Sequence, residues 1–335
     1  MTRTQLHSAL FAISTMALAL AMNGAAQAAD PTPKWCSGVK IVAINGGWNS
    51  PGDSYSQVVA NGFRQAEADL GPTVTYNFLN WDPNLALTSL RDAIKDKADG
   101  IVFVGFANEE ATRPLIDKAF AQGTIVTMAT HPLPEAQKQY VSQGMGYVGA
   151  ETQSAGFALG TETARRAGIK AGDSVFVWGF ARSSHTQGVI AAMDKVGAKV
   201  IFKEVNPAVI SGYATASEQL ADVLQADPGV KAVVTEHWYL TSVVGTNAML
   251  TNLNPGQVYF AGVDVDFPES VQSMKDGYLN LAQDQQPYLQ GYLPILNICL
   301  TKKFGFAGLN VDTSGAFIDP TNVDAVAPLV EKQIR

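Results

Sequence analysis

The stretch that decides the fold lies in the last third of the chain, where residues 259–264 read YFAGVD and residues 278–292 read YLNLAQDQQPYLQGY. Each segment is a short apolar run followed by polar side chains, Asp264 after the first and Gln285 after the second. Apolar runs of this length are typical of buried strands. Because open α/β folds bind ligands at the carboxyl ends of their strands, Asp264 and Gln285 are the first two candidate ligand contacts.

From residue 40 onward, short apolar runs alternate with helical patterns, which predicts βαβ units and a mostly parallel sheet. After residue 83, for example, Leu87, Leu90 and Ile94 share one helical face. The expected strands fall into two runs, at residues 39–44, 74–79, 101–106 and 125–130, and then at 147–149, 175–180, 200–205, 232–235 and 258–263. We therefore expect an α/β protein with two similar doubly wound lobes.

The stretch quoted above also resembles a known family, the periplasmic sugar-binding proteins of ABC importers, of the ribose-binding type. In that family a Gly-x-Asp at a strand end and a Gln shortly before a Pro both hydrogen-bond the sugar. Asp264 and Gln285 match these positions, and the run QQPYLQGY at residues 285–292 is particularly typical. The resemblance covers essentially the whole chain after the N-terminal segment, and it implies the type I periplasmic binding protein fold.

This resemblance implies that the chain crosses between the lobes three times, near residues 144–147, near Gln285 and near Gly315. Lobe one is then expected to hold residues 38–145 and 286–314. Lobe two is expected to hold residues 146–285 and 315–335, with the ligand cleft between the lobes.

The N-terminal residues read as a secretory signal peptide, residues 1–28. Arg3 precedes an apolar run over residues 9–22, and Ala26-Gln27-Ala28 has the small-x-small pattern of a cleavage site. Cleavage there places the mature protein in the periplasm. The net charge of −7 disfavours nucleic acid or an anionic membrane surface as a partner.

Cysteine usage leaves two alternatives open. The chain has two cysteines, Cys36 before the first expected strand and Cys299 in a late apolar helix. In an exported protein they are compatible with one disulfide that ties the N-terminal segment to the last third of the chain. The alternative is two unpaired thiols, with Cys299 filling core space.

A glycine-rich loop with two aromatic residues follows the first expected strand, at residues 46–55. Trp48 and Tyr55 offer flat faces for a sugar ring, and Asp53 offers acceptors for its hydroxyls. In the family an aromatic residue stands six to seven residues before a helix glycine, as Tyr55 does here. The alternative is a surface turn whose aromatic residues cover the edge of the lobe. Asp82, after the second strand, has two equal readings, as a helix cap or as a ligand contact.

Three histidines, His131, His185 and His237, each follow an expected strand end. In the family Thr130 and His131 stand where an Asp-Arg or Asn-Ser pair is usual. His185 stands near a position where an Arg commonly reaches the ligand, and His237 and Trp238 replace an Asn and an Asp. These departures remove a charged clamp, so the ligand need not be ribose or a common hexose. If all three histidines face the cleft, they change charge between about pH 7 and pH 5 and alter binding.

Two enzyme readings are weaker. The three histidines and Asp264 are chemically suitable zinc ligands, as in a secreted metal-dependent hydrolase, but they are far apart in sequence and lack local ligand spacing. Residues 144–149, GMGYVG, match the dinucleotide fingerprint, which is a weak signal alone and lies here at an expected lobe crossing. We therefore expect no metal, no cofactor and no catalytic residue.

The function predicted from the sequence is the substrate-binding component of an ABC importer. It would be a monomer that captures a sugar or polyol by hinge closure and presents it to the membrane permease. The alternative within this fold is a non-sugar cargo, such as a furanone signal, a cyclitol or a small acid.

Overall fold

The computed structural model describes residues 33–50, 53–104, 109–206 and 212–335. The expected signal peptide lies outside these residues, as does the end of the strand expected at 101–106. The chain divides into two units, residues 1–33 and 34–335, and the description below concerns the second. No helix in the described ranges is long and apolar enough to cross a membrane.

The first lobe is built on a sheet of six strands, counted within the described residues. They are β1 (Lys40–Asn45), β2 (Thr73–Phe78), β3 (Gly100–Val104), β4 (Ile125–Ala129), β5 (Gly146–Gly149) and β11 (Asn310–Asp312). They lie in the order β11-β5-β4-β3-β1-β2, and each neighbouring pair is parallel. This arrangement is the doubly wound sheet expected from the alternation of strands and helices.

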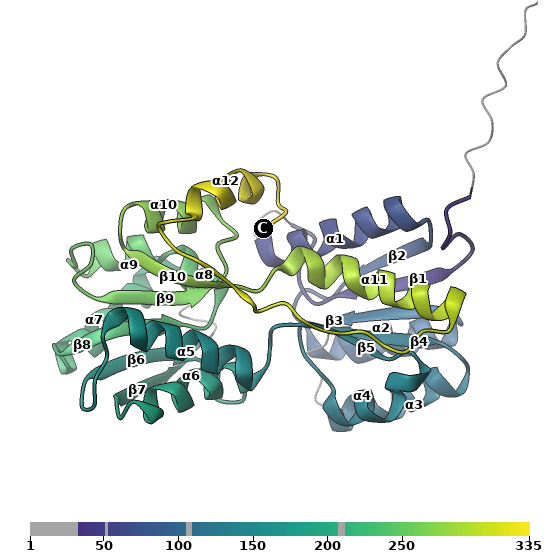
Figure 1. The fold of residues 1–335 in the computed structure, drawn as a ribbon, viewed down its shortest axis with the longest axis horizontal. Helices are drawn as coiled ribbons and strands as arrows, with labels where there is room; N and C mark the ends of the chain where they lie inside the picture. Colours follow the sequence, from purple (N-terminus) through teal and green to yellow (C-terminus); the bar gives the residue numbers. More distant parts are fainter. Residues whose placement is uncertain (1–32, 51–52, 105–108, 207–211) are drawn as a thin grey trace, which may run out of the picture. The chain divides into compact units, whose positions relative to one another are not determined.

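Helices cover both faces of this sheet. They are α1 (Ser54–Leu70), α2 (Pro83–Lys95), α3 (Glu109–Ala121), α4 (Pro134–Tyr140), the short 3₁₀ helix η1 (Val141–Gln143) and α11 (Pro287–Phe304). α1 packs against α11 on one face, and α2, α3 and α4 lie over the other (Figure 1).

The second lobe repeats this plan. Its strands are β6 (Ser174–Gly179), β7 (Lys199–Glu204), β8 (Val230–Thr235), β9 (Tyr259–Val263), β10 (Leu279–Asp284) and β12 (Ala316–Ile318). They lie in the order β12-β10-β9-β8-β6-β7, parallel except for β12, which runs antiparallel to β10.

The helices of the second lobe also form two layers. They are α5 (Gln153–Ala167), α6 (Ser184–Lys195), α7 (Tyr213–Ala226), α8 (Trp238–Ser242), α9 (Val244–Leu250), α10 (Pro268–Lys275) and α12 (Val323–Glu331). α5 packs against α6, whereas α10 contacts α8, α9 and α12 (Figure 1).

The burial of the strands explains why the sequence shows apolar runs and not alternation. Every residue of β3, β4 and β6 is buried, because helices cover both faces of a doubly wound sheet. The edge strands β2 and β7 bury little of their length and accordingly carry Thr, Asn, Lys and Glu. The amino-acid composition of each strand therefore reflects whether it lies at the centre or at the edge of its sheet.

Two glycines explain the close packing of α1 on α11. A Cβ atom at Gly62 would lie 2.1 Å from the carbonyl oxygen of Tyr288, and one at Gly291 would lie 2.0 Å from that of Val59. The two helix backbones touch at these points, so neither position tolerates a side chain without a shift. This contact sets the N-terminus of α11, and with it the segment that follows Gln285.

Strand β5 corrects one expectation. The sequence analysis assigned residues 146 onward to the second lobe, but β5 pairs with β4 and β11 in the first sheet. Asn297, buried on α11, holds it there: its Nδ2 donates to Thr127 Oγ1 at 2.7 Å and to Gly144 O at 3.0 Å. The first crossing therefore follows Gly149. Of the glycines in the fingerprint at 144–149, Gly144 ends η1, and Gly146 and Gly149 lie in β5 instead of forming a phosphate-binding turn.

Three short segments join the lobes, at residues 150–152 between β5 and α5, at 285–286 between β10 and α11, and at 313–315 between β11 and β12. A disulfide joins Cys36 to Cys299, with a Cα–Cα distance of 5.6 Å, which agrees with the pairing considered from the sequence. It ties the N-terminal segment to α11 within the first lobe.

Candidate ligand-binding site

Asp53, one of the candidate ligand contacts, is hydrogen-bonded to groups of the protein itself. It caps the N-terminus of α1, where its Oδ1 accepts a hydrogen bond from Ser56 N at 3.2 Å. Its Oδ2 accepts from Trp48 N at 2.9 Å and from Trp81 Nε1 at 2.8 Å. Both oxygens of this buried carboxylate are therefore engaged, so Asp53 holds the loop in place instead of offering a free acceptor.

Trp48 and Asp82 flank this loop. The side chain of Trp48 is 47% exposed, so its face is open to solvent. Asp82 accepts a hydrogen bond from Asn84 N at 2.8 Å and caps α2. Of its two readings, the structure shows the helix cap.

Tyr55, Thr130 and Gln290 form a buried triangle of hydrogen-bonding groups. Tyr55 Oη lies 2.6 Å from Thr130 Oγ1 and 2.7 Å from Gln290 Oε1, and Thr130 Oγ1 lies 2.9 Å from Gln290 Oε1. Two hydroxyl hydrogens serve three contacts, so one of the three contacts is a close approach of two oxygens without a hydrogen of its own. Burial raises the pKa of Tyr55 well above its usual value, so the phenol keeps its proton.

Gln290 is a site residue that the sequence analysis quoted but did not select. Its Nε2 donates to Gln285 O at 2.8 Å and to Thr313 Oγ1 at 3.2 Å, and the side chain is fully buried. It thus connects the triangle to two of the segments that join the lobes. The sequence feature that could have identified Gln290 is its place in the QQPYLQGY run at residues 285–292.

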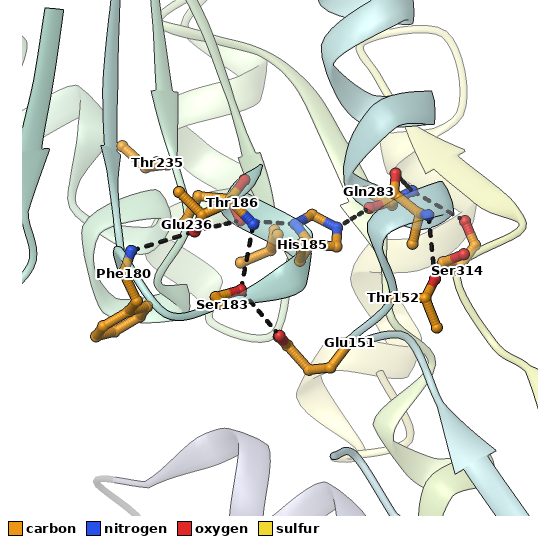
Figure 2. A network of polar contacts seen from close by, with 12 residues as sticks. Glu151, Thr152, Phe180, Ser183, His185, Thr186, Thr235, Glu236, Gln283 and Ser314 are labelled. Carbon is orange, nitrogen blue, oxygen red and sulfur yellow. Dashed lines mark hydrogen bonds and ion pairs between the residues drawn. The ribbon is translucent and has the colours of Figure 1, made fainter. Parts of the chain in front are cut away.

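His185 was expected to contact the ligand, and the structure shows its ring bonded to other side chains of the protein. Its Nδ1 lies 2.6 Å from Glu236 Oε2 and its Nε2 lies 2.7 Å from Gln283 Oε1 (Figure 2). Both ring nitrogens are therefore engaged inside the second lobe, and the side chain is 1% exposed. Burial lowers the pKa of His185, but the charge of Glu236 and the hydrogen bond to it outweigh burial and raise the pKa to about 9.

The network around His185 reaches two of the joining segments (Figure 2). Gln283 Nε2 donates to Ala155 O at 3.1 Å and to Ser314 O at 3.2 Å. Ser183 Oγ, two residues before His185, donates to Glu151 Oε2 at 3.2 Å. His185 therefore positions the joining segments, and neither Gln283 nor Glu236 was selected from the sequence.

His237 and Trp238 lie at the end of β8. His237 caps α8, where its Nδ1 accepts a hydrogen bond from Tyr239 N at 3.1 Å, and burial lowers its pKa to about 4. Trp238 stacks on Phe267 with ring centroids 5.4 Å apart and also packs against the hydrophobic core of the first lobe. Trp238 therefore spans the two lobes beside the candidate site.

The histidines do not form the pH-sensitive set expected from the sequence. His185, with a pKa of about 9, keeps its proton between pH 7 and pH 5, and His237, with a pKa of about 4, stays neutral there. His131 is half-buried directly after Thr130, and its backbone N–H donates to Ala129 O at 2.8 Å. It remains a candidate by position.

Asp264 and Gln285 stand together at the carboxyl ends of β9 and β10. Asp264 Oδ1 accepts a hydrogen bond from Gln285 N at 2.9 Å, and Asp264 adopts a left-handed backbone conformation with φ of 62°. Asp264 Oδ2 and the side-chain amide of Gln285 hydrogen-bond no other described residue. Burial raises the pKa of Asp264 well above its usual value, and the charges of Asp266 and Asp284 add to this effect.

Asp266 is the most unusual group at this edge. It is 4% exposed, and neither carboxylate oxygen has a hydrogen-bond partner among the described residues. The sequence analysis missed it, although it stands two residues after Asp264 and Val265 between them is buried.

The described residues contain no group of three or more His, Cys, Asp or Glu side chains that could hold a metal ion. The zinc reading needed His131, His185 and His237 to converge with Asp264. Instead, Glu236 and Gln283 take both nitrogens of His185, and Tyr239 N takes Nδ1 of His237.

A family model described as a periplasmic binding protein domain matches residues 47–299. Because this match covers well over half of the chain, the protein belongs to that family. A xylose/arabinose-binding protein of Sulfolobus acidocaldarius is 26% identical over 254 residues, which cover 72% of this chain and 62% of the relative. The match thus spans less than two thirds of that relative's length.

Solved structures share the fold. A carbohydrate transporter of Acidothermus cellulolyticus, in complex with myo-inositol, has a TM-score of 0.73 at 24% identity and covers 89% of this chain and 99% of its own. A solute-binding protein of Agrobacterium vitis with bound D-fucose has a TM-score of 0.72 at 18% identity, covering 85% and 97%. One from Burkholderia graminis, in complex with D-arabinose, has a TM-score of 0.71 at 16% identity, covering 86% and 97%.

Proposed function

We propose that this protein captures a small polyhydroxylated ligand, a sugar or a polyol, between its two lobes and presents it to the permease of an ABC importer. The observation that carries the proposal is the pair Asp264 and Gln285. Asp264 Oδ2 and the side-chain amide of Gln285 have no hydrogen-bond partner among the described residues, and they stand at adjacent strand ends where the resemblance expects sugar hydroxyls to bind. The relatives that bind xylose or arabinose, myo-inositol and D-fucose support this ligand class.

The residues divide the work of binding in a simple way. Asp264 accepts hydroxyl hydrogens, and Gln285 both donates and accepts. Trp48 offers an exposed aromatic face, and Trp238 forms a wall between the lobes. Hinge motion at the joining segments buries the ligand, and affinity depends on how many of its hydroxyls find partners.

The export signal expected at residues 1–28 supports a periplasmic location, and membership of the family supports a binding role without catalysis. Purified protein should therefore carry no stoichiometric zinc. About one tightly held zinc ion per chain in metal analysis would favour a hydrolase instead.

A panel of sugars, polyols and furanones, screened by thermal shift, tests the ligand class. A ligand at 100 times its dissociation constant is expected to stabilise the protein by about 2.7 kcal/mol. Stabilisation by furanones alone would favour the signalling cargo over the sugar.

Asp264→Asn tests the site. Asparagine tolerates the left-handed backbone better than alanine, so the change removes the charge without adding strain. We expect at least tenfold weaker binding in calorimetry, because a hydrogen bond to a charged group contributes about 1.5–3 kcal/mol. Asp276→Asn, an exposed change in the same lobe, is the control. Equal affinities of Asp264→Asn and the wild type would remove Asp264 from the site.

A further inference from the structure

Asp266 carries an inference beyond the residues that the resemblance supplies. Buried polar groups in folded proteins are nearly always hydrogen-bonded, because an unpaired buried group costs several kcal/mol in an apolar setting. Both oxygens of Asp266 lack a partner within the described residues although the side chain is 4% exposed. A carboxylate that stays unpaired in this way indicates donors that the described part of the chain does not supply.

The position of Asp266 places it at the contact between the lobes. Its backbone oxygen accepts a hydrogen bond from Ser54 Oγ at 2.6 Å, in the first turn of α1. The charges of Asp53, which caps α1, and of Asp284, at the end of β10, both act on its carboxyl group. Asp266 in turn acts on Asp264, so it belongs to the same wall of the site.

This wall, formed by Asp53, Asp264, Asp266 and Asp284, carries four carboxyl groups and little positive charge to balance them. Asp284 is paired with Arg335, the last residue of the chain. Asp53, Asp264 and Asp266 form no ion pair with any described residue. An anionic group placed against these carboxylates is repelled, and the repulsion is strong where water is excluded.

We propose that Asp266 binds the ligand together with Asp264, and that this wall selects a cargo that presents only hydrogen-bond donors to it, hydroxyl or ammonium, and no carboxylate or phosphate. The inference rests on the proposed function and narrows its ligand class. Polyols, cyclitols and amino sugars meet the requirement. The small acid that the sequence left open does not.

Binding at Asp266 also involves a proton. Burial raises the pKa of Asp266 to about 7, with Asp53 and Asp284 adding to the effect, so the ligand-free carboxyl group is partly protonated at neutral pH. The groups that face it are Asp53 on the cap of α1, Asp264 at the end of β9, and Asp284 with Arg335. Hydroxyl donors stabilise the ionised form. Affinity for a neutral ligand therefore rises with pH between about 6 and 8, by at most about tenfold per pH unit.

The test uses matched probes and an isosteric variant. D-glucose, D-glucosamine and D-glucuronate differ mainly in charge, and myo-inositol and D-arabinose extend the neutral set. Binding is measured by calorimetry for the wild type, for Asp266→Asn and for the surface control Asp276→Asn. We expect a neutral or aminated probe to bind and D-glucuronate not to bind. Asp266→Asn should weaken binding at least tenfold, and Asp276→Asn should leave it unchanged.

Each other outcome contradicts a stated claim. Wild-type affinity retained in Asp266→Asn, or tightest binding of D-glucuronate, overturns this inference and leaves the proposed function standing. Absence of binding to every sugar and polyol of the wider panel overturns both. If Asp266→Asn does not fold, the wild type supplies the test, because binding of D-glucuronate at least as tight as that of D-glucose overturns the inference.

Discussion

The carboxyl edges of the two sheets are built in different ways. In the first lobe, Tyr55, Thr130 and Gln290 hold one another by neutral hydrogen bonds. In the second lobe, the ionic pair of His185 and Glu236 supports the joining segments from inside. At the first edge the polar side chains are neutral and hydrogen-bond one another. The second edge combines a charged support with buried carboxylate oxygens that have no partner among the described residues.

The difference between the two edges indicates which lobe has buried acceptors that a ligand's donors could satisfy. In the second lobe, Asp266 and Glu236 Oε1 are buried acceptors without partners among the described residues. In the first lobe, Asp53 and Gln290 are fully engaged, and Ser56 Oγ, in the first turn of α1, is the orphan nearest this edge. The second lobe should therefore provide most of the polar contacts, and the first lobe mainly shape and aromatic surface.

Among the changes that test this comparison, His185→Ala should lower the free energy of unfolding the most. The change leaves Glu236 as a buried charge without its cation, and breaking a buried ion pair typically costs about 3–5 kcal/mol. The free energy of unfolding from urea titration measures the loss. Lys199→Ala removes an exposed pair with Asp227 and serves as the control, with an expected cost of about 1 kcal/mol or less. Similar losses for the two variants would show that the His185 pair contributes little.

The pH dependence of stability should come from the same pair. The pKa of His185 is raised in the folded state to about 9, above its unfolded value of about 6.5. Its contribution is therefore complete below about pH 6.5 and is lost as pH rises through about 9, at no more than about 1.4 kcal/mol per pH unit. Unfolding free energies measured from pH 6 to pH 9 should fall in the wild type and fall much less in His185→Gln. Parallel profiles would contradict this assignment.

Tyr55→Phe should have the smallest effect. It removes one hydroxyl group from a neutral triangle in which Thr130 can still donate to Gln290, so we expect a loss of about 1 kcal/mol. Because no charge is involved, the loss should be the same at pH 6 and pH 8. Tyr292→Phe, which removes an exposed hydroxyl group that donates to Asp69 at 3.2 Å, is the matched control. A loss above 3 kcal/mol for Tyr55→Phe would mean that stability depends on the polar contacts of the first edge as strongly as on those of the second.

The sequence by itself determined the architecture of this protein and the edge where its site lies. Alternating apolar runs and helical patterns predicted the two sheets, because burial on both faces shapes the composition of each strand. The strand ends at Asp264 and Gln285 were also visible, since the end of an apolar run is a local feature. The resemblance added the family, which the match over residues 47–299 confirms.

Only the tertiary structure decided which polar side chains remain available to a ligand. Asp53, His185 and Asp266 all follow strand ends. The side chains of the first two are engaged by protein donors and acceptors, whereas the carboxyl group of Asp266 has no partner among the described residues. Likewise, pairing to β4, and not local pattern, assigned β5 to the first lobe. The physical reason is distance along the chain: His185 meets Gln283 98 residues away, and Tyr55 meets Gln290 235 residues away. A side chain's hydrogen-bond partners are set by packing between such remote segments, which no local stretch of sequence encodes.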